Sequence, residues 1–369
     1  MIVGILKEPS FESRVSLLAE GVPALTKKGI TIWVESEAGA KSSCSDDEYS
    51  KNGAVVQSRD KILAEADVIL TIHPDDISSS FKNKVLIGVY QPLFNNKQMG
   101  DLAKQGLTIF SMDMLPRTTR AQSMDVLSSQ ANIAGYKAIL LAANQSPHYF
   151  PMFMTAAGSI PPAKVLILGA GVAGLQAIAT ARRLGGVVQV FDTRPAVKEE
   201  VMSLGGKFIE VEGAADASQS GGYAVEQTAE FQARQKAKIA EWIAKSDIVV
   251  STAQIPGKKA PILITTEMIE TMKNGSVIID LASATGGNTE LTKNNETVIH
   301  NGVKIIGNSA LPSDMPYDAS KLYGKNIANF LQLITNAEGN LNLNFEDDLV
   351  KGACITHDGQ IVNERVKSL

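Results

Sequence analysis

KVLILGAGVAGLQAIATARRLGGVVQVFD spans Lys164 to Asp192 and contains the parts of one βαβ unit in order. The apolar run VLIL is followed by a glycine-rich turn, by helical spacing of apolar residues, and by a second apolar run, VVQVF. Strands that alternate with helices in this way form a parallel sheet with helices on its faces. The stretch therefore predicts an α/β fold.

The turn in this stretch, GAGVAG, contains Gly169, Gly171 and Gly174. A lone GxGxxG is weak evidence, but here the flanking strand and helix are present, and Asp192 follows at about the expected 20 residues. Gly169 would allow the tight turn, Gly171 a close approach of the backbone to a pyrophosphate, and Gly174 close packing of helix on strand. The pattern predicts a dinucleotide site at the positive end of the helix. A turn that merely packs is the alternative.

The residues at the end of the second run bear on which dinucleotide is bound. Asp192 is expected to accept hydrogen bonds from the ribose hydroxyls of the adenosine and to repel a 2′-phosphate, which favours NAD(H). Arg194 lies two residues further on, and a nearby arginine can accommodate that phosphate. NAD(H) is therefore the prediction, with NADP(H) left open.

The same alternation occurs on both sides of this stretch. IVGIL, ITIWVES, ADVILTIH, KVLIGVY and LTIFSMDM precede it, while DIVVSTAQ, SVIIDLA and VKIIG follow it. Helical spacing at 125–146 and 319–338 predicts two crossing helices. We therefore predict two doubly wound Rossmann-like domains. Residues 1–126 plus 311–369 form a discontinuous N-terminal domain, and a dinucleotide-binding domain of residues 127–310 is inserted in it.

The composition excludes several classes of protein. The 369 residues carry a formal charge of −4, so no basic excess indicates nucleic-acid binding. Cys44 and Cys354 are far apart and form no CxxC motif, and the four histidines lack metal-ligand spacing, so no metal is predicted. No secretory signal is expected, and the longest apolar run contains three glycines, which disfavours a membrane span.

Two polar segments fit the alternation poorly. RTTRAQSMDVLSSQ, residues 117–130, gathers polar side chains ahead of the glycine-rich turn, and by itself it is typical of a salt-bridged loop before a helix. DASQSGGYAVEQTAEFQARQ, residues 216–235, is longer than an ordinary βα connection. Its composition fits a solvated loop and a functional lid equally well.

Several segments resemble one family: RTTRAQSMDVLSSQANIAGY, AAGSIPPAKVLILG, GAGVAGLQAIATARRLGGVVQVFDTRP, KNGSVIIDLASATGGN and KGACITHDGQIV. Together they look like domain I, the NAD(H)-binding component, of proton-translocating nicotinamide nucleotide transhydrogenase. The resemblance covers nearly the whole chain, and RAQSMD and GGYA are its distinctive motifs. Alanine dehydrogenases share the architecture and are the nearest alternative.

The resemblance implies a loop that holds the nicotinamide end of NAD(H), in which the residues acting on the ring are Arg117, Gln122, Asp125 and Ser128. It also implies a mobile loop that closes over the nucleotide. The cofactor contacts that it implies are Arg117, Thr118, Thr119, Gln122, Gly169, Gly171, Val172, Gly174, Asp192, Thr193, Arg194, Gly222, Tyr223, Gln235 and Gln254. Gln254 departs from the family, where an apolar residue is expected.

Direct hydride exchange between two nicotinamides needs no general acid or base. It needs geometry, with the two ring C4 atoms about 3 to 3.5 Å apart and aligned. Asp125 and Ser128 can bond the carboxamide if this segment has begun a helix, and a carboxylate favours the positive charge that develops on the ring. Gln122 suits the nicotinamide ribose, and Arg117 suits the pyrophosphate or the carboxamide oxygen.

The resemblance further implies the partners. NADP(H) and the proton channel belong to other subunits, which span the membrane, and this chain is the separate soluble alpha-type subunit. It is expected to form a homodimer and to lie at the cytoplasmic face of a bacterial inner membrane.

Two other functions stay open. An alanine dehydrogenase needs a lysine and a histidine as acid and base, but an ungapped alignment places His73 and Gln91 at those positions. Arg14 could still hold a substrate carboxylate. The second alternative is a nucleotide-sensing module that binds NADH without changing its oxidation state.

Overall fold

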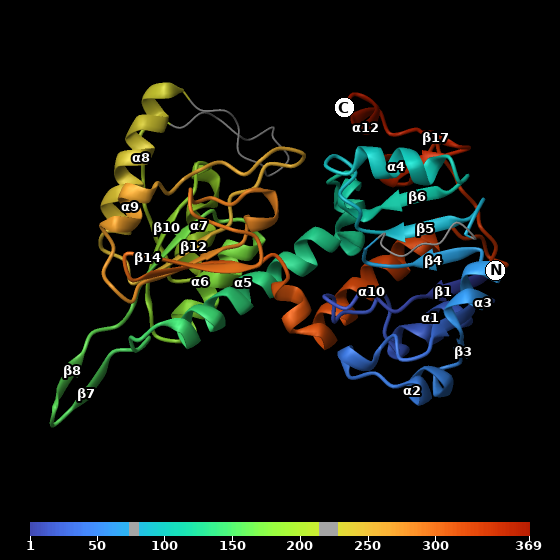
Figure 1. The fold of residues 1–369 in the computed structure, drawn as a ribbon, viewed down its shortest axis with the longest axis horizontal. Coiled ribbons are helices and arrows are strands. Elements are labelled where there is room, and N and C mark those ends of the chain that lie inside the picture. Colours follow the sequence, from blue (N-terminus) through green and yellow to red (C-terminus); the bar gives the residue numbers. More distant parts are fainter. Residues whose placement is uncertain (74–80, 214–227) are drawn as a thin grey trace. The chain divides into compact units, whose positions relative to one another are not determined.

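The computed structural model describes residues 1–73, 81–213 and 228–369, and the chain forms two compact units (Figure 1). Unit 1 consists of Met1–Gln130 and Pro312–Leu369, and unit 2 consists of Ala131–Leu311. Each unit is built on a mostly parallel sheet, so the predicted α/β class with two Rossmann-like units is confirmed.

The sheet of unit 1 has the strand order β17-β16-β6-β5-β4-β1-β2-β3. From β1 the chain winds outward to β2 and β3 and then returns to place β4 on the other side of β1. The carboxyl ends of β1 and β4 therefore form a topological switch point. The strands are β1 (Ile2–Ile5), β2 (Thr31–Glu35), β3 (Val55–Gln57), β4 (Val68–Leu70), β5 (Val85–Gly88), β6 (Thr108–Ser111), β16 (Cys354–His357) and β17 (Gln360–Ile361).

The sheet of unit 2 repeats this winding, with the order β11-β10-β9-β12-β13-β15-β14 and a switch point between β9 and β12. Leu168 at the end of β9 lies level with Phe191 of β10 and Ser251 of β12. The strands are β9 (Lys164–Leu168), β10 (Val187–Phe191), β11 (Lys207–Phe208), β12 (Ile248–Ser251), β13 (Val277–Asp280), β14 (Glu296–His300) and β15 (Val303–Gly307), and a separate hairpin contains β7 (Phe153–Thr155) and β8 (Gly158–Ile160).

Helices cover both faces of each sheet, which explains why the strands are continuously apolar. Val165 and Ile167 of β9 belong to one core, and Leu166 and Leu168 belong to the core on the opposite face. The helices of unit 1 are α1 (Val22–Thr26), α2 (Asp46–Lys51), α3 (Arg59–Glu65), α4 (Asn96–Ala103), α10 (Pro316–Leu333), α11 (Asp348–Ala353) and α12 (Glu364–Lys367). Those of unit 2 are α6 (Val172–Arg183), α7 (Lys198–Ser203), α8 (Ala229–Ile243) and α9 (Thr266–Glu270).

The two long helices expected from the sequence are present. α5 (Val126–Gln145) follows the 117–125 segment, and α10 begins earlier than its apolar spacing indicated because Pro316 occupies its first turn. In the part of the chain that the structure describes, no helix has the length and apolar character needed to cross a membrane.

Candidate functional site

The glycine-rich turn lies at the carboxyl end of β9, at the switch point of unit 2. Gly169 has φ +102°, and a Cβ there would lie 2.4 Å from Oγ1 of Thr252. A Cβ on Gly174 would lie 1.9 Å from the carbonyl oxygen of Gly169. Both glycines are therefore required by the fold itself, one by the turn and the other by the approach of α6 to that turn.

Gly171 differs from its two neighbours. Its φ of −76° and ψ of −171° are open to any residue, and a Cβ there would meet no protein atom within 4 Å. Packing therefore does not explain the missing side chain. Gly171 is the N-cap of α6, where backbone N–H groups lack partners within the helix and the helix dipole is positive. Open space before unsatisfied N–H groups fits a pyrophosphate.

Asp192 follows β10 and is buried. One carboxylate oxygen accepts from the N–H of Ala170 at 2.7 Å and from Nη2 of Arg194 at 2.7 Å, and the other accepts from N and Nε of Arg194, both at 2.8 Å. The hydrogen bond with Asp192 raises the pKa of Arg194. Asp192 thus fixes the glycine-rich turn, and a ribose hydroxyl would share its oxygens with Arg194. Thr193 lies half-buried between them.

The 117–128 segment lies in unit 1. Its centre is a 3-10 helix, η4 (Thr119–Met124), whose Ala121 and Met124 are buried in the core. The predicted cofactor contacts Arg117, Thr118, Thr119 and Gln122 are all exposed. The segment therefore anchors itself with apolar side chains and presents its polar side chains to solvent.

Asp125 and Ser128, expected to be neighbours if a helix had begun, are in contact. Oδ1 of Asp125 accepts from the backbone N–H of Ser128 at 2.9 Å, and Oδ2 accepts from its hydroxyl at 2.5 Å. Asp125 thus caps the first turn of α5. The cap holds this carboxylate in one orientation, whatever else it binds.

The remaining predicted contacts are dispersed in unit 2. Val172 is 39% exposed in the first turn of α6, and Gln235 is half-buried in α8. Gln254 is exposed after β12, and its Nε2 donates to the carbonyl of Leu281 at 2.9 Å. Gly222 and Tyr223 lie outside the described residues.

The sequence analysis missed a charged cluster at the switch point of unit 1. Oε1 and Oε2 of Glu12 accept from Nε and Nη2 of Arg14 at 2.9 and 2.7 Å, and Oε2 lies 3.0 Å from Nε2 of His73. Nη1 of Arg14 donates to Gln130 at 2.7 Å. Burial alone would raise the pKa of Glu12, but the hydrogen bonds from Arg14 and His73 outweigh burial and hold it far below its ordinary range.

Glu8 completes this cluster. It is buried behind Glu12, and it accepts from the N–H groups of Ile72 at 2.6 Å and His73 at 3.2 Å. Burial raises the pKa of Glu8 to about 7, because those two bonds offset only part of the desolvation. The only sequence signal for this cluster was the run of charged residues that follows the first strand.

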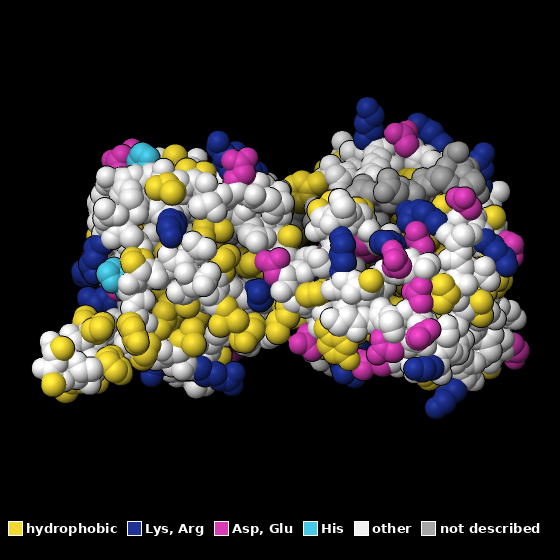
Figure 2. Space-filling model, turned by 60° about the horizontal axis from the view of Figure 1, so that its bottom comes forward, with side chains coloured by type: hydrophobic (Ala, Val, Ile, Leu, Met, Phe, Trp, Pro, Cys, Tyr) yellow, Lys and Arg dark blue, Asp and Glu magenta, His cyan; other side chains and the backbone are white. Residues whose placement is uncertain are grey.

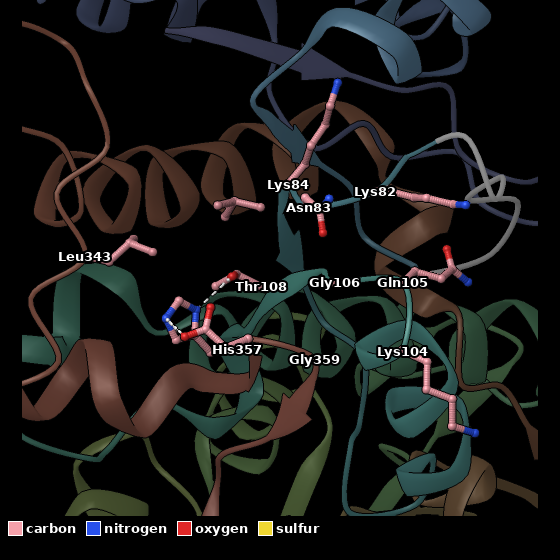
Figure 3. Close-up of a pocket in the computed structure, with 12 residues that line it drawn as sticks. Lys82, Asn83, Lys84, Lys104, Gln105, Gly106, Thr108, Leu343, His357 and Gly359 are labelled. Carbon is pink, nitrogen blue, oxygen red and sulfur yellow. Dashed lines mark hydrogen bonds and ion pairs between the residues drawn. The ribbon is translucent and has the colours of Figure 1, made fainter.

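A cavity of about 820 Å³ opens at the other end of the unit 1 sheet, where β5 and β6 begin (Figure 3). Its polar groups already have partners. Thr108 and His357 point toward one another and are 3.0 Å apart, Lys104 pairs with Asp101, and Lys84 donates to the carbonyl of Ala64. The cavity lies away from the carboxyl edge, so we assign it no ligand.

Two parallel sheets, with a glycine-rich turn and helix N-terminus at the switch point of the second, define the Rossmann-like class of dinucleotide-dependent oxidoreductases. Family models described as "Alanine dehydrogenase/PNT, N-terminal domain" and "Alanine dehydrogenase/PNT, C-terminal domain" match residues 4–134 and 138–364. The chain therefore belongs to the alanine dehydrogenase/PNT family.

Within this family, the chain is more similar to transhydrogenases. It is 42% identical to an NAD(P) transhydrogenase alpha subunit of Rickettsia prowazekii, over 98% of this chain and 96% of that protein. The Rhodospirillum rubrum counterpart is 44% identical over 95% of each. An alanine dehydrogenase of Staphylococcus epidermidis is 26% identical over 91% of this chain and 88% of that protein.

Solved structures give the same ranking. A transhydrogenase from Sinorhizobium meliloti superimposes with a TM-score of 0.90 at 45% identity, over 98% of this chain and 100% of that one. An L-alanine dehydrogenase superimposes with a TM-score of 0.82 at 22% identity, over 100% and 98%, which shows the shared fold alone. The resemblance to transhydrogenase predicted from the sequence is confirmed.

Proposed function

We propose that this chain binds NAD(H) and transfers a hydride directly from NADH to NADP⁺ held by a partner transhydrogenase subunit. The bound nicotinamide supplies the hydride. The observation that carries the proposal is the open space at Gly171, before the N-terminus of α6, which no internal contact explains. The names of the most similar relatives support the same reaction.

In this proposal unit 2 binds the dinucleotide through its backbone. The N–H groups at the start of α6 bond the pyrophosphate, and Gly171 allows its approach. Asp192, Thr193 and Arg194 lie at the strand end that receives the adenosine ribose, and the carboxylate favours NAD(H) over NADP(H). Val172 and Gln254 border the adenosine side.

The 117–128 segment of unit 1 binds the nicotinamide end. Arg117 and Gln122 are exposed and have the hydrogen-bonding groups for the pyrophosphate and the ribose. Asp125, oriented by its bonds to Ser128, bonds the carboxamide and favours the positive charge that develops on the ring. An exposed segment also leaves the ring accessible to a cofactor that another polypeptide carries.

Amino-acid dehydrogenation has less support. That reaction needs a cation for the substrate carboxylate and a base beside the ring. Arg14 is the available cation, but Glu12 binds it through two hydrogen bonds and also contacts His73. We expect no NADH from alanine plus NAD⁺. Rapid NADH formation would favour the dehydrogenase alternative, whereas an NADH-binding protein inactive with every partner would be a sensing module.

We also propose that two copies associate and that the dimer docks on membrane-spanning subunits that carry NADP(H) and the proton channel. Figure 2 shows apolar side chains gathered on the β7–β8 hairpin, at the far left. Met152, Met154 and Ile160 are 65%, 71% and 42% exposed. A two-stranded hairpin this apolar is poorly stable alone, which supports packing against a second copy.

The test of hydride transfer combines the purified chain with a transhydrogenase NADP(H)-binding component and follows reduction of an NADP⁺ analogue by NADH. Asp125→Asn keeps a good helix cap but removes the charge. We expect it to slow hydride transfer at least about tenfold while NADH affinity changes less than about twofold. An unchanged rate would remove the role of Asp125, and an inactive native mixture would refute the proposed reaction.

A further inference from the structure

The 117–128 segment is held from outside by α10. Asn326 and Asn329 lie one turn apart on this helix, and their Nδ2 atoms both donate to the carbonyl oxygen of Ser123, at 2.9 and 2.8 Å. Ser123 lies in η4, two residues before Asp125. A short 3-10 helix has poor internal hydrogen bonds, so its position depends on such external contacts.

Asn326 also binds the other side of Asp125. Its side chain is buried, and its Oδ1 accepts from the hydroxyl of Ser129 at 2.7 Å. One amide therefore links the last turn of η4 to the first turn of α5. Asp125 and Ser128 lie between the two points that it fixes.

A second contact comes from the start of α11. Nη2 of Arg120 lies 2.5 Å from both carboxylate oxygens of Asp347. Asp347 is the N-cap of α11 and accepts from the N–H of Leu349 at 2.9 Å. The pair ties the exposed side of η4 to a helix terminus that the core fixes through Leu349 and Val350.

We propose that Asn326, Asn329 and Asp347 are positioning residues for hydride transfer. This inference rests on the proposed function. They touch neither cofactor; they fix the backbone that carries Gln122, Asp125 and Ser128. Because hydride transfer between rings depends on alignment, a displacement of about 1 Å can cost roughly 100-fold in rate while the binding contacts survive. Loss of these contacts is therefore expected to reduce the rate more than the affinity.

The experiment uses the full chain mixed with the NADP(H)-binding component. Asn329→Ala is the main variant, because Asn329 is only half-buried and Asn326 retains its bond to Ser123. Lys325→Ala, an exposed change on the same helix, is the matched control. NADH affinity is measured by titration, and hydride transfer by single-turnover kinetics with NADH and with NADH deuterated at the transferred position.

We expect Asn329→Ala to lower the single-turnover rate about tenfold with full expression of the isotope effect, and to change NADH affinity less than about twofold. Asn329→Gln is expected to restore part of the rate. Asp347→Asn keeps the α11 cap and loses the charge, so Asp347→Asn, Arg120→Gln and their double variant should show equal, smaller losses.

Rate and affinity falling together, or rates equal to the control, would overturn the positioning role. An inactive native chain would instead refute the proposed function, so the two failures are distinguishable. A variant that unfolds is recognised by its melting temperature, and Asp347→Asn with Arg120→Gln then decides the question at exposed positions.

Discussion

The two units present the same winding but opposite carboxyl edges. In unit 2 the switch point contains glycine, open space and the N-terminus of α6. In unit 1 the equivalent edge contains Glu8, Glu12, Arg14 and His73, which bind one another or the backbone. The winding of the sheet therefore creates a place for a ligand, and the side chains decide whether the protein has already filled it.

The difference has a physical basis in what each edge leaves unsatisfied. A buried charge must be paired, and Glu12 pairs Arg14 within the chain. Helix N–H groups facing open space remain available to an anion. Variants that disturb one edge should thus have little effect on the other.

The largest effect is expected at the glycine-rich turn. Gly174→Ala places a methyl group against the carbonyl of Gly169, and we expect it to destabilise the protein by roughly 4 to 5 kcal/mol in denaturant unfolding. Gly171→Ala is the matched control, because its methyl group meets no protein atom. It should cost at most about 1 kcal/mol of stability but lower NADH affinity about tenfold. Equal stability losses would contradict this division between fold and site.

The next effect is expected at the edge of unit 1. Glu12→Ala leaves Arg14 partly buried without its carboxylate, which should cost roughly 3 to 4 kcal/mol in denaturant unfolding. NADH affinity, measured by titration under folding conditions, should stay unchanged. Adding Arg14→Met removes the uncompensated charge, so the double variant should regain much of the stability. If it does not, the pair is not what closes this edge.

The smallest effect is the pH dependence from Glu8. Its pKa is raised to about 7 in the folded protein from an ordinary value of 4.5, so its protonated form is favoured by folding. This contribution is fully present below pH 4.5 and is lost as the pH rises through 7. Relative to Glu8→Gln, the native chain should lose about 3 kcal/mol across this interval.

Glu12 gives this measurement an internal contrast. Its pKa is lowered, so its contribution is present above pH 4.5 and is lost as the pH falls below that value. The two carboxyl groups together should stabilise unit 1 most near pH 4.5. Unfolding curves collected from pH 4 to pH 8 check both slopes, and a flat difference between native chain and Glu8→Gln would contradict the assignment.

The fold was largely predictable because its signals are local. Continuous apolar strands and the spacing of Gly169, Gly171 and Gly174 describe one βαβ unit within a short stretch. β14 escaped prediction because it is a largely exposed antiparallel edge strand without an apolar run. The β7–β8 hairpin escaped because its apolar residues face outward.

The site was only partly predictable. Contact between Asp125 and Ser128 followed from their spacing, since a helix begins there. The contact of Glu12 with His73 joins the ends of different strands, and no local pattern indicates it. Asn326 lies on the buried face of α10, where apolar periodicity offers no reason to expect an amide.

Unit 1 is assembled from two distant parts of the chain, and this has a consequence for biosynthesis. β16 pairs with β6, and α10 supplies Tyr323, Ile327 and Phe330 to the first core, so unit 1 lacks these parts until the end of translation. Unit 2 is complete once Leu311 has left the ribosome. The contacts of α10 with Ser123 therefore form among the last, and a chain cut short before α10 would keep an intact glycine-rich turn while its 117–128 segment stays unanchored.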